Sequence, residues 1–199
     1  MGRPKALVVG ADGVPWLRRG VLTLLAGGCR RVIVVLGAAA DQALANLPAD
    51  QAVTAVVAED WADGLSASLR AALGTLRADA DADAALVSLV DLPRLPVGAV
   101  ARLHADARRM SLRQATYAGR PGHPVLIGAE HWDLLAADLS GDRGAGRYLR
   151  SHGAHPIPCD DLWDGADVDA APDAHDAASA SAAADDAQYG GNAQETAGS

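Results

Sequence analysis

The sequence of 199 residues contains no phenylalanine, two cysteines, and a single lysine, Lys5, among its 17 basic residues. Cys29 and Cys159 are too few and too far apart for a disulfide framework or a metal knuckle, so we interpret both as structural thiols. Basic residues are not in excess, because 25 acidic residues give a formal charge of −8, and this balance disfavours nucleic-acid binding. No apolar run approaches the roughly 18 residues of a membrane span. We therefore expect a cytoplasmic protein that acts on small molecules, with no nucleic-acid or membrane partner.

The composition changes after Asp173. Residues 174–199 contain no Lys or Arg and consist largely of Ala, Ser, Asp and Gly. Such a segment buries too little apolar surface to offset the entropy of ordering the chain. We expect one folded domain over residues 1–173 and a disordered tail over residues 174–199.

The folded part alternates short apolar runs with longer amphipathic ones, a pattern typical of strands joined by crossover helices. Strands are predicted at 6–9, 31–36, 52–57, 84–90, 113–117 and 124–127, and helices at 15–26, 39–47, 65–76, 97–110, 131–139 and 145–151. This order predicts a three-layer, Rossmann-like α/β fold with a mostly parallel sheet and a small β-hairpin insertion around residue 120. Ligands of such folds bind at the carboxyl ends of the strands.

Asp91 directly follows the most apolar predicted strand, and Asp167 and Asp169 follow the last apolar stretch. A carboxylate at a strand end is well placed to hold Mg²⁺, which takes one or two carboxylates together with substrate phosphates. The alternatives are a helix-capping or turn role for Asp91 and a solvated loop for the later pair.

Three further positions carry weaker signals. Gly64 and Ser68 lie where a loop enters a helix, and backbone N–H groups and hydroxyls there can bind an anion, although Ser66 could simply cap the helix. His123 lies between a turn and a strand, where a histidine is usually polar surface. Lys5 is the single lysine in a chain that otherwise uses arginine, and its compact ammonium could have a function that a guanidinium cannot fulfil. The alternative is an ordinary surface lysine near a terminus.

Taken in order, these segments resemble the molybdenum cofactor cytidylyltransferase branch of the MobA-like NTP transferase family. The resemblance covers residues 1–173 and rests on six motifs: Gly2-Arg3-Pro4-Lys5-Ala6-Leu7, Trp61 with Gly64 and Ser68-Leu69, Asp91-Leu92-Pro93, Gly119 with Gly122-His123-Pro124-Val125-Leu126, Gly141-Asp142-Arg143-Gly144-Ala145, and Asp167-Val168-Asp169 with Asp173.

The resemblance implies a nucleotide-diphospho-sugar transferase type of fold and the transfer of a nucleoside monophosphate to a phosphorylated acceptor, with release of pyrophosphate. CTP is favoured over GTP as the donor, molybdopterin is the leading acceptor, and a molybdoenzyme or its chaperone is a further partner. The residues that it implies are Lys5 and Asp91 for catalysis, Lys5, Gly64 and Ser68 for the nucleotide, Gly122 and His123 for the acceptor, and Asp91 and Asp169 for Mg²⁺. Asp169 is preferred to Asp167 because it occupies the second acidic position of the family's D-x-D.

Relatives carry a buried strand and a glycine-rich loop ahead of the segment that begins here at Met1. The resemblance therefore implies a sheet without its central strand. We expect the chain to fold poorly or to be inactive by itself. The simplest hypothesis is that the start of the sequence was assigned too late.

Two other functions remain open. One is an NAD(P)H-dependent reductase of the nicotine blue oxidoreductase type, although the sequence has no G-x-G-x-x-G. The other is a non-catalytic remnant or a partner in molybdoenzyme assembly.

Overall fold

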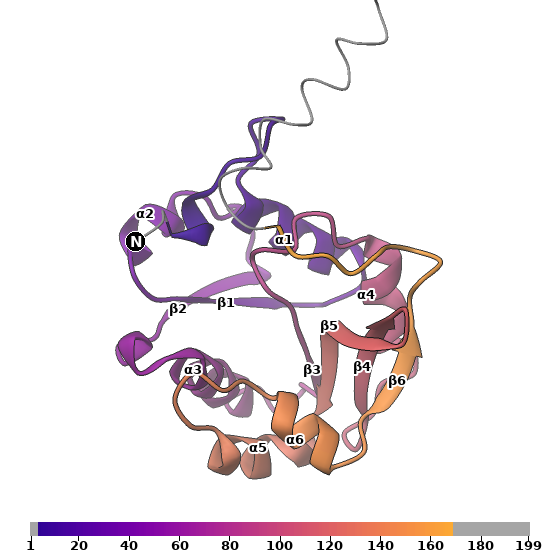
Figure 1. The fold of residues 1–199 in the computed structure, drawn as a ribbon. Helices are drawn as coiled ribbons and strands as arrows, with labels where there is room; N and C mark the ends of the chain where they lie inside the picture. Colours follow the sequence, from indigo (N-terminus) through magenta and orange to yellow (C-terminus); the bar gives the residue numbers. More distant parts are fainter. Residues whose placement is uncertain (1–3, 169–199) are drawn as a thin grey trace, which may run out of the picture.

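The computed structural model describes residues 4–168 (Figure 1). The α-helices are α1 (Trp16–Ala26), α2 (Ala40–Leu44), α3 (Leu65–Arg77), α4 (Val97–His104), α5 (Trp132–Asp138) and α6 (Gly146–Ser151). The strands are β1 (Val32–Leu36), β2 (Val53–Val57), β3 (Ala84–Val87), β4 (Leu112–Tyr117), β5 (Arg120–Gly128) and β6 (His155–Pro158). Short 3-10 helices are η1 (Lys5–Leu7), η2 (Trp61–Asp63) and η3 (Ala129–His131).

The strands form two separate sheets. β1 and β2 pair in parallel, and the second sheet has the order β3-β5-β4-β6. Within it β5 runs antiparallel to β3 and β4, whereas β4 and β6 run parallel. The predicted hairpin is therefore confirmed as β4 and β5, with β5 placed between β3 and β4 in the sheet.

Helices cover both faces of the strands, which gives the predicted three layers. On one face, Leu17 and Val21 of α1 pack on Val32, Val34 and Leu36 of β1. On the same face α4 contributes Ala99, Val100 and Leu103 to a second core, and α1 contacts α4. On the other face, α3, α5 and α6 enclose a third core with Leu73, Leu135 and Tyr148 at its centre. The predicted α/β architecture is confirmed.

Most predicted elements are present with shorter bounds, and two differ. Residues 6–9, predicted as a strand, instead form η1 followed by an isolated bridge between Val9 and Pro15. β6 is not apparent from the sequence because Pro156 and Pro158 interrupt its pattern; the sheet accepts them because β6 is an edge strand. Asp169 and the tail predicted over 174–199 lie outside the described residues.

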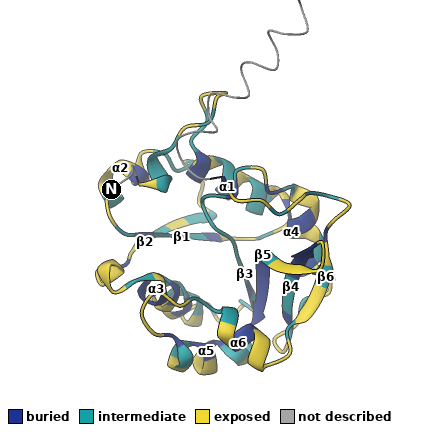
Figure 2. Ribbon diagram, viewed as in Figure 1, coloured by how far each residue is buried: buried dark blue, intermediate teal, exposed yellow. Residues whose placement is uncertain are grey.

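A cavity of about 1010 Å³ lies between the two sheets and is lined by residues of both β1 and β3. Because they line this cavity, β1 and β3 contain residues that are only half-buried, whereas every residue in the second half of β5 is buried (Figure 2). Within residues 4–168, no helix has the length and apolar character needed to cross a membrane.

Candidate active site

Asp91 lies in the turn after β3 and forms an ion pair with Lys5 of η1. The Lys5 ammonium donates a hydrogen bond to Asp91 Oδ2 at 2.7 Å, and the two residues are 86 positions apart in the chain. Asp91 is mostly buried, with 16% of its side chain exposed, and its second oxygen, Oδ1, has no hydrogen-bond partner among the described residues. A buried carboxylate oxygen without a donor is left available for a ligand. Asp91 lies in a turn, as one of the two alternatives expected, and the pairing with Lys5 gives it a further contact there.

The segment that carries the late acidic pair reaches this point. The backbone N–H of Val168 donates to the carbonyl oxygen of Asp91 at 2.9 Å, and the Val168 side chain is buried. The neighbouring Asp167 is exposed. The tertiary structure therefore brings the D-x-D segment beside Asp91, as far as Val168.

His123 is positioned by the strands of the second sheet. It is half-buried and directly precedes the buried half of β5, and its carbonyl accepts a hydrogen bond from the Tyr117 hydroxyl at 2.8 Å. Burial lowers the pKa of His123 below its usual value of 6.5, while the negative charge of Asp91 acts in the opposite direction. The imidazole is thus mainly neutral at neutral pH and can both donate and accept a hydrogen bond.

Gly122 allows this arrangement because a Cβ atom at that position would lie 2.9 Å from the ring of Tyr117. Gln114 of β4 donates from its side-chain amide to the Gly122 carbonyl at 3.3 Å. The sequence analysis did not single out Tyr117 or Gln114, since their role depends on the pairing of β4 with β5.

Gly64 directly precedes α3, and both its backbone conformation and its close neighbours require a glycine at this position. Its φ of 101° lies in the region that favours glycine, and a Cβ atom would lie 2.2 Å from Oδ1 of Asp142. The N–H of Ser66 donates to the carbonyl of Gly141 at 3.1 Å. Ser66 does not cap α3 through its hydroxyl, which is buried without a hydrogen-bond partner in the described part of the chain. Two of the six motifs, 61–69 and 141–145, are therefore packed together.

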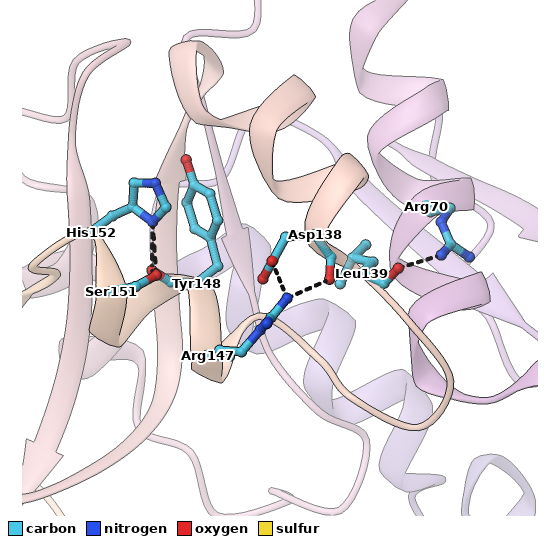
Figure 3. A network of polar contacts seen from close by, with 7 residues as sticks. All are labelled: Arg70, Asp138, Leu139, Arg147, Tyr148, Ser151 and His152. Atoms are coloured by element: carbon cyan, nitrogen blue, oxygen red, sulfur yellow. Dashed lines mark hydrogen bonds and ion pairs between the residues drawn. The ribbon is translucent and has the colours of Figure 1, made fainter.

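A polar network behind these motifs holds the connection between α5 and α6 in place (Figure 3). Arg70 of α3 donates to the carbonyl of Leu139 at 2.6 Å, where the connection begins. Arg147 of α6 pairs with Asp138 at the end of α5. At the far end of α6 the rings of Tyr148 and His152 stack with centroids 3.8 Å apart. These contacts fix the loop that carries Gly141 and Asp142 against the start of α3.

Ser68 and His123 both line the cavity between the sheets, as do Gln114 and Gly144. The structure thus brings one predicted nucleotide residue, Ser68, and one predicted acceptor residue, His123, to one cavity, whereas Gly64 and Gly122 do not line it. Asp91 and Lys5 adjoin it through Val90, the residue before Asp91. Across residues 4–168, no three His, Cys, Asp or Glu side chains gather closely enough to hold a metal ion by themselves.

Cys29 lies in the wall of the cavity, whereas Cys159 does not line it. Cys159 is fully buried and packs against α4, and desolvation raises the pKa of its thiol. Burial likewise raises the pKa of Cys29. A thiol with a raised pKa carries little thiolate at neutral pH, which agrees with a structural role.

Comparisons with known proteins agree with one another. Residues 1–156 match the family described as MobA-like NTP transferase domain. A protein named nicotine blue oxidoreductase, from Paenarthrobacter nicotinovorans, is 37% identical over an alignment of 161 residues, and the match covers 74% of this chain and 74% of that protein.

Solved structures of similar fold include Rv0371c from Mycobacterium tuberculosis H37Rv, at 27% identity and a TM-score of 0.70, covering 85% of both chains. Its complex with manganese matches at 26% identity and a TM-score of 0.67, over 84% of this chain and 88% of that one. An Rv0371c homologue from Mycobacterium sp. strain JC1 has 28% identity and a TM-score of 0.72, over 92% of this chain and 90% of that one. The chain belongs to the MobA-like NTP transferase family.

Proposed function

We propose that this protein transfers a nucleoside monophosphate from an NTP, with CTP favoured over GTP, to a phosphorylated acceptor of the molybdopterin type. The observation that carries the proposal is the buried Asp91 carboxylate, which pairs with Lys5 through one oxygen and has no donor to the other among residues 4–168. The ion pair lies beside a cavity lined by Ser68 and His123. A cation-binding carboxylate and a lysine next to a deep cavity suit a triphosphate substrate.

Asp91 and, by the family resemblance, Asp169 would hold a divalent cation, Mg²⁺ or Mn²⁺. The Oδ1 atom of Asp91 fits this role because carboxylate oxygens are the ligands that such hard cations prefer. The manganese complex of Rv0371c supports a divalent cation as a component of related sites. When bound, the cation would supply positive charge to the phosphates, which would complete its coordination together with water.

The reaction forms a bond between an acceptor phosphate oxygen and the α-phosphorus of the NTP. The bond from that phosphorus to the bridging oxygen of the β-phosphate breaks, and pyrophosphate leaves. Phosphoryl chemistry of this kind depends chiefly on positioning and on stabilisation of negative charge. Lys5 would offset charge on the triphosphate, Gly64 and Ser68 would contact the nucleotide, and Gly122 and His123 would face the acceptor.

The test is pyrophosphate release from CTP or GTP with divalent cation and molybdopterin, comparing the wild type with Asp91→Asn. We expect the substitution to abolish release, because the amide removes the negative charge and half of the oxygen ligands. Asp133→Asn is the matched control, since Asp133 is an exposed carboxylate paired with Arg77 on another face. Equal release by wild type and Asp91→Asn would refute the assignment of Asp91.

A second function is favoured by the 37% identity to the protein named nicotine blue oxidoreductase. NAD(P)H-dependent reduction would be detected as NADPH oxidation with an electron-accepting dye, in the absence of any NTP. Binding of CTP or of molybdopterin without turnover would instead favour the third function, a partner in molybdoenzyme assembly. The three assays thus separate the three functions in one protein preparation.

A further inference from the structure

One aromatic side chain, Tyr117, contacts two segments that the proposed function uses. Tyr117 ends β4 and is buried, with 4% of the residue exposed. It belongs to a core that also contains Leu92, the residue after Asp91, and Cys159, the first residue of the 159–168 segment. This core is separate from the one that packs against α3, which carries Ser68. Tyr117 is therefore placed to act on the acceptor and cation residues and not on the nucleotide residues.

The hydroxyl of Tyr117 fixes the backbone at the two acceptor residues. It donates a hydrogen bond to the carbonyl oxygen of His123 at 2.8 Å. Desolvation by burial raises the pKa of Tyr117 to about 12, so the phenol stays protonated at neutral pH and remains a donor. A Cβ atom at Gly122 would lie 2.9 Å from Cδ2 of the ring. Tyr117 thus contacts Gly122 and His123 through both its ring and its hydroxyl.

The same ring lies against the 159–168 segment. Gly165 has a φ of 77°, and a Cβ atom there would lie 2.3 Å from Cδ2 and 2.5 Å from Cγ of Tyr117. Trp163 packs edge to face on the ring, with centroids 5.5 Å apart and the two planes at 78°. Cδ2 is the ring atom nearest to a built Cβ at both Gly122 and Gly165. Two backbone segments therefore make their closest contact with one carbon of Tyr117.

The 159–168 segment is anchored by hydrogen bonds at both ends. At its start, the backbone N–H of Cys159 donates to the carbonyl of Thr116 in β4 at 3.0 Å. At its end, the backbone N–H of Val168 donates to the carbonyl of Asp91 at 2.9 Å. The next residue in the sequence, Asp169, is the one that the family resemblance assigns to the cation. The tyrosine ring thus supports the segment between its anchor on β4 and its anchor on Asp91.

We propose that Tyr117 is a positioning residue, which sets the place of the cation segment beside Asp91 relative to the acceptor residue His123. Its ring holds the 159–168 segment and its hydroxyl holds the acceptor segment. The hydroxyl takes no part in bond making, because it is already bonded to a backbone carbonyl. Transfer requires the cation, the phosphorus and the acceptor oxygen to be held within a narrow range of positions. This role rests on the proposed function for its catalytic consequence.

The amide of Val168 reports whether the ring holds the segment on Asp91, and this measurement needs no ligand. Gly165→Ala places a methyl group against Cδ2 and Cγ of Tyr117. Gly153→Ala is the matched control, since Gly153 also has a positive φ, 64°, but has nothing within 4 Å of a built Cβ. We expect hydrogen exchange of this amide, followed by NMR in the full chain, to be at least about tenfold faster in Gly165→Ala than in the control. Equal exchange in two folded variants overturns the role of the ring.

Tyr117→Phe keeps the ring and removes only the hydroxyl. Exchange of the Val168 amide should therefore stay within about twofold of the wild-type rate, because a hydrogen bond elsewhere contributes little to it. The carbonyl 13C shift of His123 should change, because that carbonyl loses its donor. An unchanged shift, or exchange at Val168 as fast as in Gly165→Ala, overturns the division of roles between ring and hydroxyl.

Pyrophosphate release from CTP with molybdopterin and Mg²⁺ tests the catalytic consequence. Tyr117→Phe should raise the KM for molybdopterin about two- to tenfold and leave the KM for CTP unchanged, because the hydroxyl holds only the acceptor segment. Gly165→Ala should raise the Mg²⁺ concentration that gives half of the maximal rate, whereas Gly153→Ala should not. A merely structural role would lower the amount of active protein without separating the two substrates.

Failure of the proposed function gives a different result from failure of this role. If the wild type releases no pyrophosphate from CTP or GTP, nucleotidyl transfer is refuted, while the Val168 exchange and the His123 shift still decide whether Tyr117 holds both segments. If the wild type is active and Tyr117→Phe and Gly165→Ala keep its KM values and its dependence on Mg²⁺, Tyr117 is not a positioning residue although the transfer stands.

Discussion

Substitution of Gly64 by alanine tests how the start of α3 and the 141–144 loop fit together. The φ and ψ of Gly64, 101° and −169°, lie in a region used almost only by glycine, which costs an alanine about 1–3 kcal/mol. The new Cβ would also lie 2.2 Å from Oδ1 of Asp142 and 2.8 Å from the carbonyl carbon of Gly141. Overpacking against backbone typically costs about 1–3 kcal/mol more. We expect Gly64→Ala to lose about 2–6 kcal/mol of a total near 5–15 kcal/mol.

The matched control lies on the same helix. Gly74 is an interior residue of α3 with nothing within 4 Å of a built Cβ, so Gly74→Ala should gain about 0.5–1 kcal/mol. In thermal unfolding followed by circular dichroism, Gly64→Ala should lower the Tm by at least about 4 °C, while Gly74→Ala raises it slightly. A Gly64→Ala Tm equal to that of the wild type would refute the reasoning, because neither strain nor contact would then exist.

The remaining predictions concern His123, Tyr117 and Cys159. Because burial lowers the pKa of His123 in the folded state, its neutral form stabilises the fold above pH 6.5 and that contribution is lost as the pH falls from 6.5 toward the folded value. His123→Gln should therefore flatten the dependence of the urea midpoint on pH in that range, and an unchanged slope would contradict the shift. Tyr117→Phe removes the hydrogen bond to the His123 carbonyl and should cost about 0.5–1.5 kcal/mol in urea unfolding. Tyr117→Phe with wild-type stability would mean that this bond contributes nothing. Cys159, fully buried and with a raised thiol pKa, should react with a thiol reagent only after unfolding; rapid labelling of the native protein would disprove its burial.

The sequence alone was sufficient to predict those elements whose hydrophobic pattern is visible within the element itself. Five consecutive apolar residues made β1 recognisable, and the spacing of Leu69, Leu73 and Leu76 made α3 recognisable. The motifs that contain Ser68 and His123 also marked positions that line one cavity, and Val90, which precedes the Asp91 motif, lines it too. Strand ends and helix starts gather at one edge of an α/β sheet, which explains this grouping.

Tertiary structure decided whatever depends on partners distant in the sequence. The residues 6–9 have the composition of a strand, yet they form η1 and a single bridge, since a strand exists only where a neighbouring strand pairs with it. The two prolines of β6 obscure its strand pattern in the sequence, and β6 can contain them because it lies at the edge of the sheet. The ion pair between Lys5 and Asp91 joins residues 86 positions apart, and no local pattern specifies it.

The sequence by itself thus determined the alternation of helices and strands and the polar residues that follow the strands, because hydrophobic periodicity and turn chemistry are local properties. Only the tertiary structure decided that β5 lies between β3 and β4, that no described residue donates to Asp91 Oδ1, and that β1 and β3 line one cavity. The physical reason is that strand order and burial follow from long-range pairing and packing, whose free energy is shared among residues that the chain holds far apart.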